Sequence, residues 1–232
     1  MSLLLCLLLL AADPPAQKVP QLVERLEAGD QPGALALLKE IGGLKGDHAE
    51  AKALVKLIRS RRPRKSPEVL EACFMALRGI GSRKVTRDLL RLLDHRPLKG
   101  DPRVRIGVCR AIEGSADPAA VKELVKLMRD NEDPVVAAAA RAAGAYRYAR
   151  EPVRKELFKT ILDIYEATWN LKNSVKPELK IQKARAEKKW AVVAKPMRKS
   201  LELLSNTTQR YPPAWRHWWN KNKKRKWGPA PE

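Results

Sequence analysis

The sequence predicts an all-α solenoid of about four stacked helix pairs, followed by a helical C-terminal extension. First, prolines and leucine-rich segments recur with a period of 35 residues, which is typical of stacked supersecondary units. Second, aromatic residues make up only 5% of a chain rich in Leu, Ala, Val and Lys, which favours helices over sheets. Third, 44% of the 232 residues are hydrophobic, enough for a continuous core.

The first residues predict a secretory signal peptide over residues 1–12. Leu3 to Ala12 form an apolar run whose single thiol is Cys6, and Asp13 begins the segment that ends it. The run is too short to span a bilayer as a helix. No Lys or Arg precedes it, so a buried first helix and a misassigned start codon remain as alternatives. Export to the periplasm, the cell surface or the medium is expected if the signal is real, and a cytoplasmic location otherwise.

The first helix of each pair is expected to begin at a proline. Ser66, Asp101 and Asp133 each precede one of these prolines, as N-cap residues do. A proline at the first helical position loses only an N–H group that would have no partner there. Glycines near the other end of each segment predict where the first helices stop. The prolines are Pro32, Pro67, Pro102 and Pro134, and the glycines are Gly79, Gly114 and Gly144.

The second helices repeat more strictly than the first. Leu54–Ile58, Leu89–Leu93 and Leu124–Met128 lie at an unbroken spacing of 35 residues, and Leu157–Leu162 echoes them. In the first three segments two apolar pairs flank one polar residue, so each helix has one buried face. A single helical hairpin cannot bury that face, and neighbouring pairs must therefore stack.

The segment Asp101–Arg105, which reads Asp-Pro-Arg-Val-Arg, resembles the HEAT repeat, in which Asp, Val and Arg open the first helix. The resemblance covers about residues 30–165 and implies HEAT-like repeats over residues 18–171. Folds of this kind carry many functions, so the resemblance indicates a fold more strongly than a partner.

The resemblance also implies hydrogen bonds between repeats from the Arg of the motif. Arg105 holds that position in one repeat, whereas Leu70 and Ala137 hold the equivalent positions in its neighbours. These bonds are therefore expected in one repeat alone.

Residues 172–232 are expected to form a basic, Trp-rich helical region. Lys172–Lys176 precedes Pro177 and predicts a break between helices. A helix is expected to follow as far as Ser205, and Pro196 should kink or divide it.

All six tryptophans lie after residue 168, and three of them, Trp215, Trp218 and Trp219, share one helix face. A packing cap is favoured there over an exposed ligand platform. The segment Tyr211–Asn220 resembles a Trp-rich terminal motif of exported HEAT-repeat proteins of planctomycete-type bacteria. The basic run Lys221–Lys226 follows, either as a solvated tail or as a contact for nucleic acid or a membrane surface.

No pattern in the sequence predicts catalysis, a cofactor or a metal site. The histidines His48, His95 and His217 are far apart and have no metal-ligand spacing with another His or Cys. Nucleophile-elbow, phosphate-loop and H-E-x-x-H motifs are missing from the sequence. Cys73 and Cys109 lie within apolar helical patterns, so inert buried thiols are favoured over a disulfide. A protein without enzymatic activity is expected.

The formal net charge of +21 favours anionic partners such as nucleic acid, acidic polysaccharide, lipid head groups or acidic proteins. Basic residues recur in the 35-residue register at two positions of the first three second helices, four residues apart and therefore on one face, and the fourth repeat extends both rows. The resemblance to HEAT repeats implies that these helices line a concave groove. Asp88, Glu123 and Glu156 lie three positions before basic residues and leave an ion-paired, solvated face as the alternative. This candidate basic ladder consists of Lys52, Lys56, Arg87, Arg91, Lys122, Lys126, Lys155 and Lys159.

Two functions of different class follow from these patterns. The first is an exported, non-catalytic repeat scaffold that binds an unidentified protein through a basic grooved surface. The second is a protein that binds nucleic acid or another polyanion.

If the signal peptide is real, cell fractionation will place the chain outside the cytoplasm, with a mature N-terminus just after Ala11 or Ala12. N-terminal sequencing of the purified protein checks this expectation. Recovery of the protein from the cytoplasm with Met1 retained would contradict export.

Overall fold

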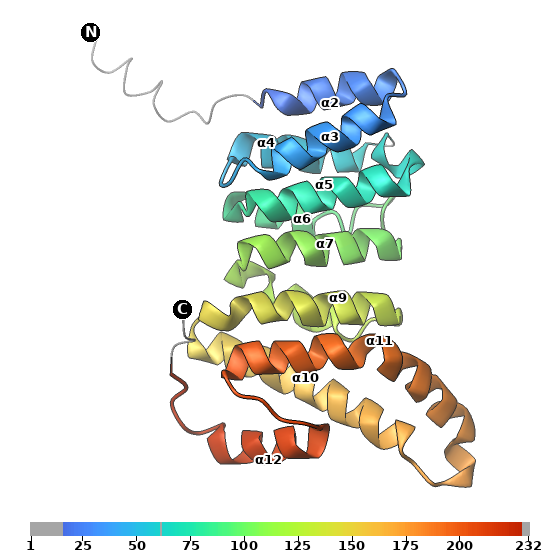
Figure 1. Cartoon of the computed structure of the whole chain (residues 1–232), viewed down its shortest axis with the longest axis vertical. Coiled ribbons are helices and arrows are strands. Elements are labelled where there is room, and N and C mark those ends of the chain that lie inside the picture. The colour runs from blue at the N-terminus through green and yellow to red at the C-terminus, as the bar shows by residue number, and fades with distance from the viewer. Residues whose placement is uncertain (1–15, 61, 229–232) are drawn as a thin grey trace.

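The computed structural model describes residues 16–60 and 62–228, and these ranges contain helices and no strand. The helices stack in two layers (Figure 1), which confirms the predicted all-α solenoid. The first layer consists of α3 (Gln31–Gly42), α5 (Pro67–Ile80), α7 (Pro102–Ser115), α9 (Asp133–Gly144) and α11 (Lys180–Ser205). The second layer consists of α4 (His48–Arg59), α6 (Thr86–Leu90), α8 (Val121–Leu127) and α10 (Glu151–Lys172).

The two ends of the stack are covered by further helices. At one end α2 (Lys18–Glu27) packs on α3 and α4, and at the other α12 (Pro212–Asn222) packs on α10. Short 3-10 helices connect the longer elements: η1 (Pro63–Lys65), η2 (Arg83–Val85), η3 (Pro118–Ala120), η4 (Ala145–Tyr148) and η5 (Pro177–Leu179). Four helix pairs are therefore present, and α11 takes the next place in the first layer, against α9.

The predicted starts of the first helices are correct for two repeats. Ser66 Oγ accepts a hydrogen bond from Val69 N at 3.4 Å, and an Asp101 carboxylate oxygen accepts one from Arg103 N at 2.9 Å. The capping role predicted for Asp133 is wrong, because α9 already begins at that residue. Glu132 holds the N-cap position and makes no side-chain cap there.

The predicted ends of two first helices are wrong. Gly79 and Gly114 lie inside α5 and α7, which continue to Ile80 and Ser115. The left-handed residues that end these helices are Gly81, with φ of 64°, and Ala116, with φ of 43°. Gly144 is the last residue of α9, as expected.

Gly79 and Gly114 instead allow neighbouring backbones to touch. A Cβ atom on Gly79 would lie 2.2 Å from the carbonyl oxygen of Gly42 on α3. A Cβ atom on Gly114 would lie 2.0 Å from the carbonyl oxygen of Arg78 on α5. No side chain fits at these distances, so glycine at these two positions sets how closely the first-layer helices approach.

Cys73 and Cys109 are fully buried free thiols in the core of the first layer, as predicted. Burial raises the pKa of each thiol to about 12, because the low-dielectric core disfavours the thiolate. Both thiols are therefore protonated and unreactive in the folded protein.

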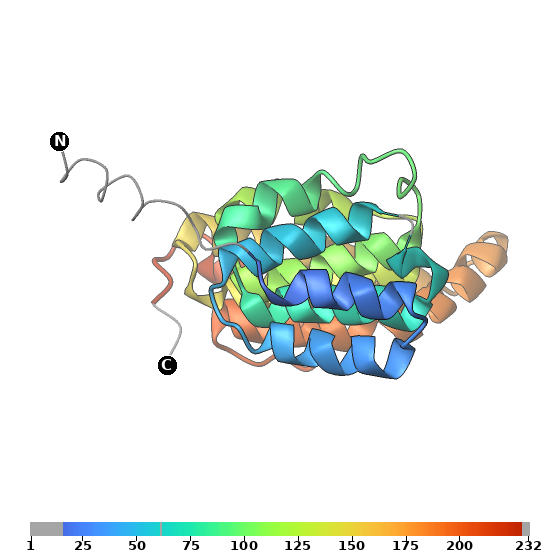
Figure 2. The same ribbon diagram turned by 90° about the horizontal axis from the view of Figure 1, so that it is seen from above.

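The helices α10 and α11 are the longest, with 22 and 26 residues, and pack together as a hairpin. The hairpin tip projects beyond the stack (Figures 1 and 2). The predicted break before Pro177 is confirmed, since α10 ends at Lys172. Pro196 does not divide α11, which runs through it, although Figure 1 shows that the axis of this helix bends.

Among the helices that the structure describes, none combines the length and apolar character needed to cross a membrane. The predicted signal peptide over residues 1–12 lies outside the described residues.

The glycine contacts predict that alanine at Gly79 or Gly114 lowers stability, whereas helix propensity alone predicts that it raises stability. Alanine in place of Gly79 or Gly114 gains up to about 1 kcal/mol of helix propensity. The overlap with a neighbouring backbone carbonyl costs more, because overpacking a tight contact typically costs about 1–3 kcal/mol. We expect each variant to lower the free energy of unfolding by about 1–2 kcal/mol in urea titrations. Gly228→Ala, where an added Cβ atom would have no neighbour within 4 Å, is the control, and equal or higher stability of Gly79→Ala would contradict the contact.

Candidate binding surface

The basic ladder lies on the second layer of the stack. Its residues come from α4, α6 with the turn after it, α8 and α10. Seven of the eight side chains are exposed, and Lys155 is half-buried. Consecutive helices of a stack lie roughly 8–10 Å apart, so residues at equivalent positions follow one another along the layer.

Half of the ladder has no acidic partner in the part of the chain that the structure describes. Within the described residues, ion pairs occur at Arg91, Lys126, Lys155 and Lys159, and none occurs at the other four. Three of those four share the 35-residue register and belong to consecutive second helices. We call them the open basic row: Lys52, Arg87 and Lys122.

The neighbouring row is partly neutralised. Arg91 Nη1 lies 2.9 Å from Asp88 Oδ1, and Lys126 Nζ lies 3.1 Å from Glu123 Oε1. These are the pairs between residues three apart that the ion-paired alternative predicted. Lys56, in the same register, has no such pair among the described residues. Exposed pairs of this kind contribute little to stability, but they lower the net charge that a partner would meet.

In the fourth repeat the lysines take part in intramolecular contacts. Lys155 Nζ lies 2.5 Å from Glu151 Oε1 and donates a hydrogen bond of 2.8 Å to the carbonyl oxygen of Arg225. Lys159 Nζ pairs with Asp163 at 3.3 Å, whereas the sequence suggested Glu156 as its partner. Lys155 thus helps to hold the C-terminal segment, and the open part of the ladder is confined to the first three pairs.

Four tryptophans pack around Phe158 of α10. The ring centroid of Phe158 lies 5.7 Å from that of Trp215 and 5.3 Å from that of Trp219, whose ring stacks on it at 20°. Trp218 and Trp227 each lie 5.3 Å from the same ring. Trp215 is fully buried and Trp219 is 7% exposed, so the Trp-rich segment forms a packing cap on the second layer, as predicted.

The segment 223–228, beyond α12, is tied to the start of α10. The guanidinium of Arg154, a residue only 3% exposed, donates hydrogen bonds to the carbonyl oxygens of Gly228 at 2.6 Å and Arg147 at 3.3 Å. Burial lowers the pKa of Arg154 from its ordinary value. Trp227 N donates to Glu151 at 3.2 Å. The basic side chains of the run before Trp227 remain exposed.

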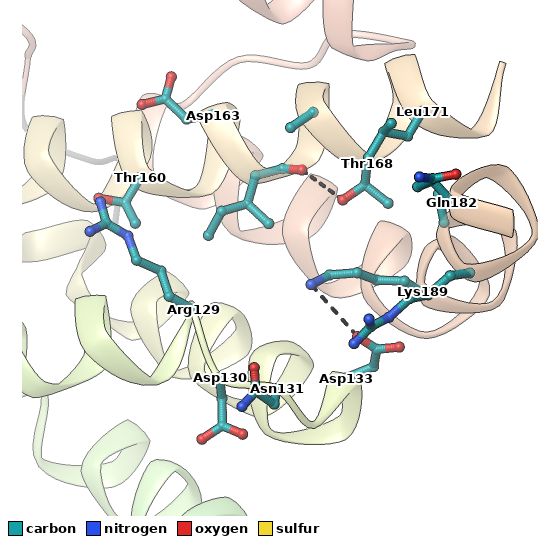
Figure 3. Close-up of a pocket in the computed structure, with 14 residues that line it drawn as sticks. Arg129, Asp130, Asn131, Asp133, Thr160, Asp163, Thr168, Leu171, Gln182 and Lys189 are labelled. Carbon is teal, nitrogen blue, oxygen red and sulfur yellow. Dashed lines mark hydrogen bonds and ion pairs between the residues drawn. The ribbon is translucent and has the colours of Figure 1, made fainter. Parts of the chain in front are cut away.

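A charged hollow at the base of the α10–α11 hairpin has a volume of about 530 Å³ (Figure 3). Its three carboxylates all have basic partners. Asp130 pairs with Arg105 at 3.0 Å, Asp133 with Lys189 at 3.6 Å and Asp163 with Arg216 at 2.7 Å. These ion pairs join α7 to the turn before α9, α9 to α11, and α10 to α12.

The Arg105 contact matches the expectation for the HEAT motif. Arg105 on α7 reaches Asp130 in the turn before α9, so it joins one repeat to the next. His48, His95 and His217 belong to α4, a loop and α12, and no group of metal-binding side chains occurs in the described part of the chain.

Two features escaped the sequence patterns. Glu50 is buried on α4, and its carboxylate accepts hydrogen bonds from Gln17 N, Lys18 N and Val19 N at 2.7, 2.6 and 3.1 Å. It therefore caps the start of α2, which lies 31 to 33 residues away in the sequence. A three-dimensional contact of this kind has no local signal. The second feature is the hydrogen bond from Arg154 to Gly228, because these two residues lie 74 positions apart in the sequence.

Residues 98–163 match the family described as HEAT repeats. The matched range extends from the loop before α7 into α10 and includes the Arg105 contact. Among curated proteins, none matches the chain.

The aromatic cap predicts a large effect of one substitution. Trp215→Ala leaves a cavity beside Phe158 and should lower the free energy of unfolding by about 3–5 kcal/mol. The matched control is Tyr211→Ala, at a 48% exposed side chain just before α12, which should change stability by less than about 0.5 kcal/mol. Calorimetry on both variants checks this. Unchanged stability of Trp215→Ala together with a loss of partner binding would make the tryptophans a recognition surface instead.

Proposed function

Because this chain is a HEAT-repeat protein, we propose that it is a non-catalytic scaffold that binds another macromolecule, in the first place a protein. HEAT-repeat proteins are typically scaffolds for protein interaction. The proposed binding surface is the exposed face of the second layer. The observation that carries the proposal is the open basic row, which has no ion pair within the described residues.

The two layers differ in how their charges are used. On the first layer Arg78 pairs with Glu113 at 2.7 Å, and Arg110 pairs with Glu71, so charges of both signs join α5 to α7. On the second layer the open basic row has no ion pair with a carboxylate of the described residues. Side chains that are not needed within the fold are available to a partner, and their common sign selects an acidic one.

An acidic segment of another protein fits this surface. The row crosses three consecutive helices, so an extended chain that carries carboxylates at intervals could meet one cation on each helix. The second candidate is nucleic acid or another polyanion. The net charge of +21 favours it, because polyanion binding depends on total positive charge more than on shape.

Export is part of the proposal and rests on residues 1–12 alone. An exported scaffold would meet acidic proteins or polysaccharides, whereas a cytoplasmic one would also meet nucleic acid.

The proposal is tested by reversing the open basic row. We expect Lys52→Glu with Arg87→Glu and Lys122→Glu to reduce recovery of the partner in affinity capture at least about tenfold, because like charges then face an acidic partner. The matched control reverses three exposed lysines of first-layer helices, Lys39, Lys188 and Lys195, and has the same net charge. Equal losses in both variants would show that only total charge matters.

The second candidate is separated from the first by salt. For a duplex DNA probe followed by fluorescence anisotropy, the slope of log affinity against log salt should fall by roughly 0.9 for each phosphate that the variant no longer neutralises. A slope that drops by about 3 in the row variant alone would favour the polyanion candidate. Absence of DNA binding by the unmodified chain would exclude duplex DNA as the partner.

A further inference from the structure

The tip of the α10–α11 hairpin exposes aliphatic side chains. Val175 is 93% exposed and Ile181 is 83% exposed, the highest values for large hydrophobic residues in the described part of the chain. Leu171, at the end of α10, is 39% exposed. Figures 1 and 2 show the hairpin projecting away from the stack, so these side chains stand at a protruding end rather than in a groove.

The same tip is strongly basic. Between residues 167 and 186 the sequence contains five basic side chains and a single carboxylate, that of Glu178. Lys176 and Lys180 are exposed and lie on either side of the 3-10 turn that separates Val175 from Ile181. Aliphatic residues thus alternate with ammonium groups over the whole tip.

Aromatic rings form the base of the tip. Tyr165 of α10 stacks on Trp190 of α11, with centroids 4.8 Å apart and an interplanar angle of 8°. Trp169 lies 5.2 Å from Trp190, and Lys172 Nζ lies 5.3 Å above the Trp169 ring. Both tryptophans are half-buried, so they keep the two helices together and leave part of each ring at the surface below the tip.

We propose that the hairpin tip is a membrane-surface contact: Val175 and Ile181 enter the interface of an anionic lipid layer while the surrounding lysines meet its head groups. Exposed aliphatic residues leave water when they enter the acyl boundary, and this transfer is favourable. Lysines close to an anionic surface each strengthen binding about fivefold. Tryptophan rings favour the depth of the head groups, which is where the base of the tip would lie.

A protein partner fits the tip less well. The cores of protein interfaces are depleted of lysine, and stable interfaces bury roughly 800 Å² on each side over complementary surfaces. The tip is a narrow projection in which lysines flank each exposed aliphatic residue. A fluid surface that carries negative charge accommodates this shape and composition.

The test uses the full chain and lipid vesicles in a flotation experiment. We expect binding to phosphatidylcholine vesicles with about 30% phosphatidylserine, and much weaker binding to phosphatidylcholine alone. Val175→Asp with Ile181→Asp should reduce binding to the anionic vesicles at least about tenfold. Lys176→Glu with Lys180→Glu should also reduce it at least about tenfold.

Two control variants show whether these losses of vesicle binding are specific to the tip. Met75→Asp with Val192→Asp places two carboxylates at side chains that are 41% and 40% exposed and lie away from the tip. Lys39→Glu with Lys45→Glu matches the charge of the lysine reversal at two exposed side chains of α3 and the turn after it, at the other end of the stack. The apolar segment Leu3–Leu10 is present in every variant, so differences between variants report the tip.

Tip variants that float like the unmodified chain, or losses of equal size in the matched variants, would overturn the proposal. So would an unmodified chain that binds neither kind of vesicle. If the tip variants fail to capture a protein that the unmodified chain captures but keep full vesicle binding, the tip is a protein contact and not a lipid contact.

Discussion

The rest of the structure depends on direct backbone contact between neighbouring first-layer helices. Gly79 on α5 touches Gly42 on α3, and Gly114 on α7 touches the backbone of Arg78 on α5. These backbone contacts limit how closely α3, α5 and α7 approach one another. Polar contacts then join the repeats at their loops. Arg59 Nη2 donates to the carbonyl oxygen of Asp88 in the next repeat at 3.2 Å, and Arg83 donates in the same direction to that of Ser115. The Tyr146 hydroxyl donates to the carbonyl oxygen of Asp117 in the preceding repeat.

The second layer is built under a weaker constraint, and this is where binding is proposed. Its middle helices are short, with five residues in α6 and seven in α8, and only their inner faces enter the core. The outer faces need only to be polar. Charges there can repeat with one sign because packing does not require acidic partners, whereas ion pairs such as Arg78–Glu113 link the first-layer helices. The periodic core therefore presents basic residues at a regular interval along one face.

The sequence period predicted the helix pairs, but it could not predict contacts between residues that are distant in the sequence. The 35-residue spacing identified the helix pairs, because each repeat buries the same apolar positions against its neighbours. It misread Gly79 as a helix end, since a glycine near the end of an apolar segment has the same local signal whether it ends the helix or touches a neighbouring backbone. At the candidate site, the 35-residue spacing predicted that the members of the open basic row occupy equivalent positions on consecutive second helices. It could not find that Lys155 bonds to Arg225, because that contact depends on how the chain end folds back over α10.

Site-specific photo-crosslinking is the most direct measurement of the central claim, which is that partners bind on the second layer. A photoreactive amino acid is placed at Arg87 in the open basic row, or at Lys39, an exposed position of the first layer. We predict that the partner, identified by mass spectrometry in cells of the source organism, crosslinks to position 87 and not to position 39. The same partner crosslinked mainly at position 39 would contradict this claim.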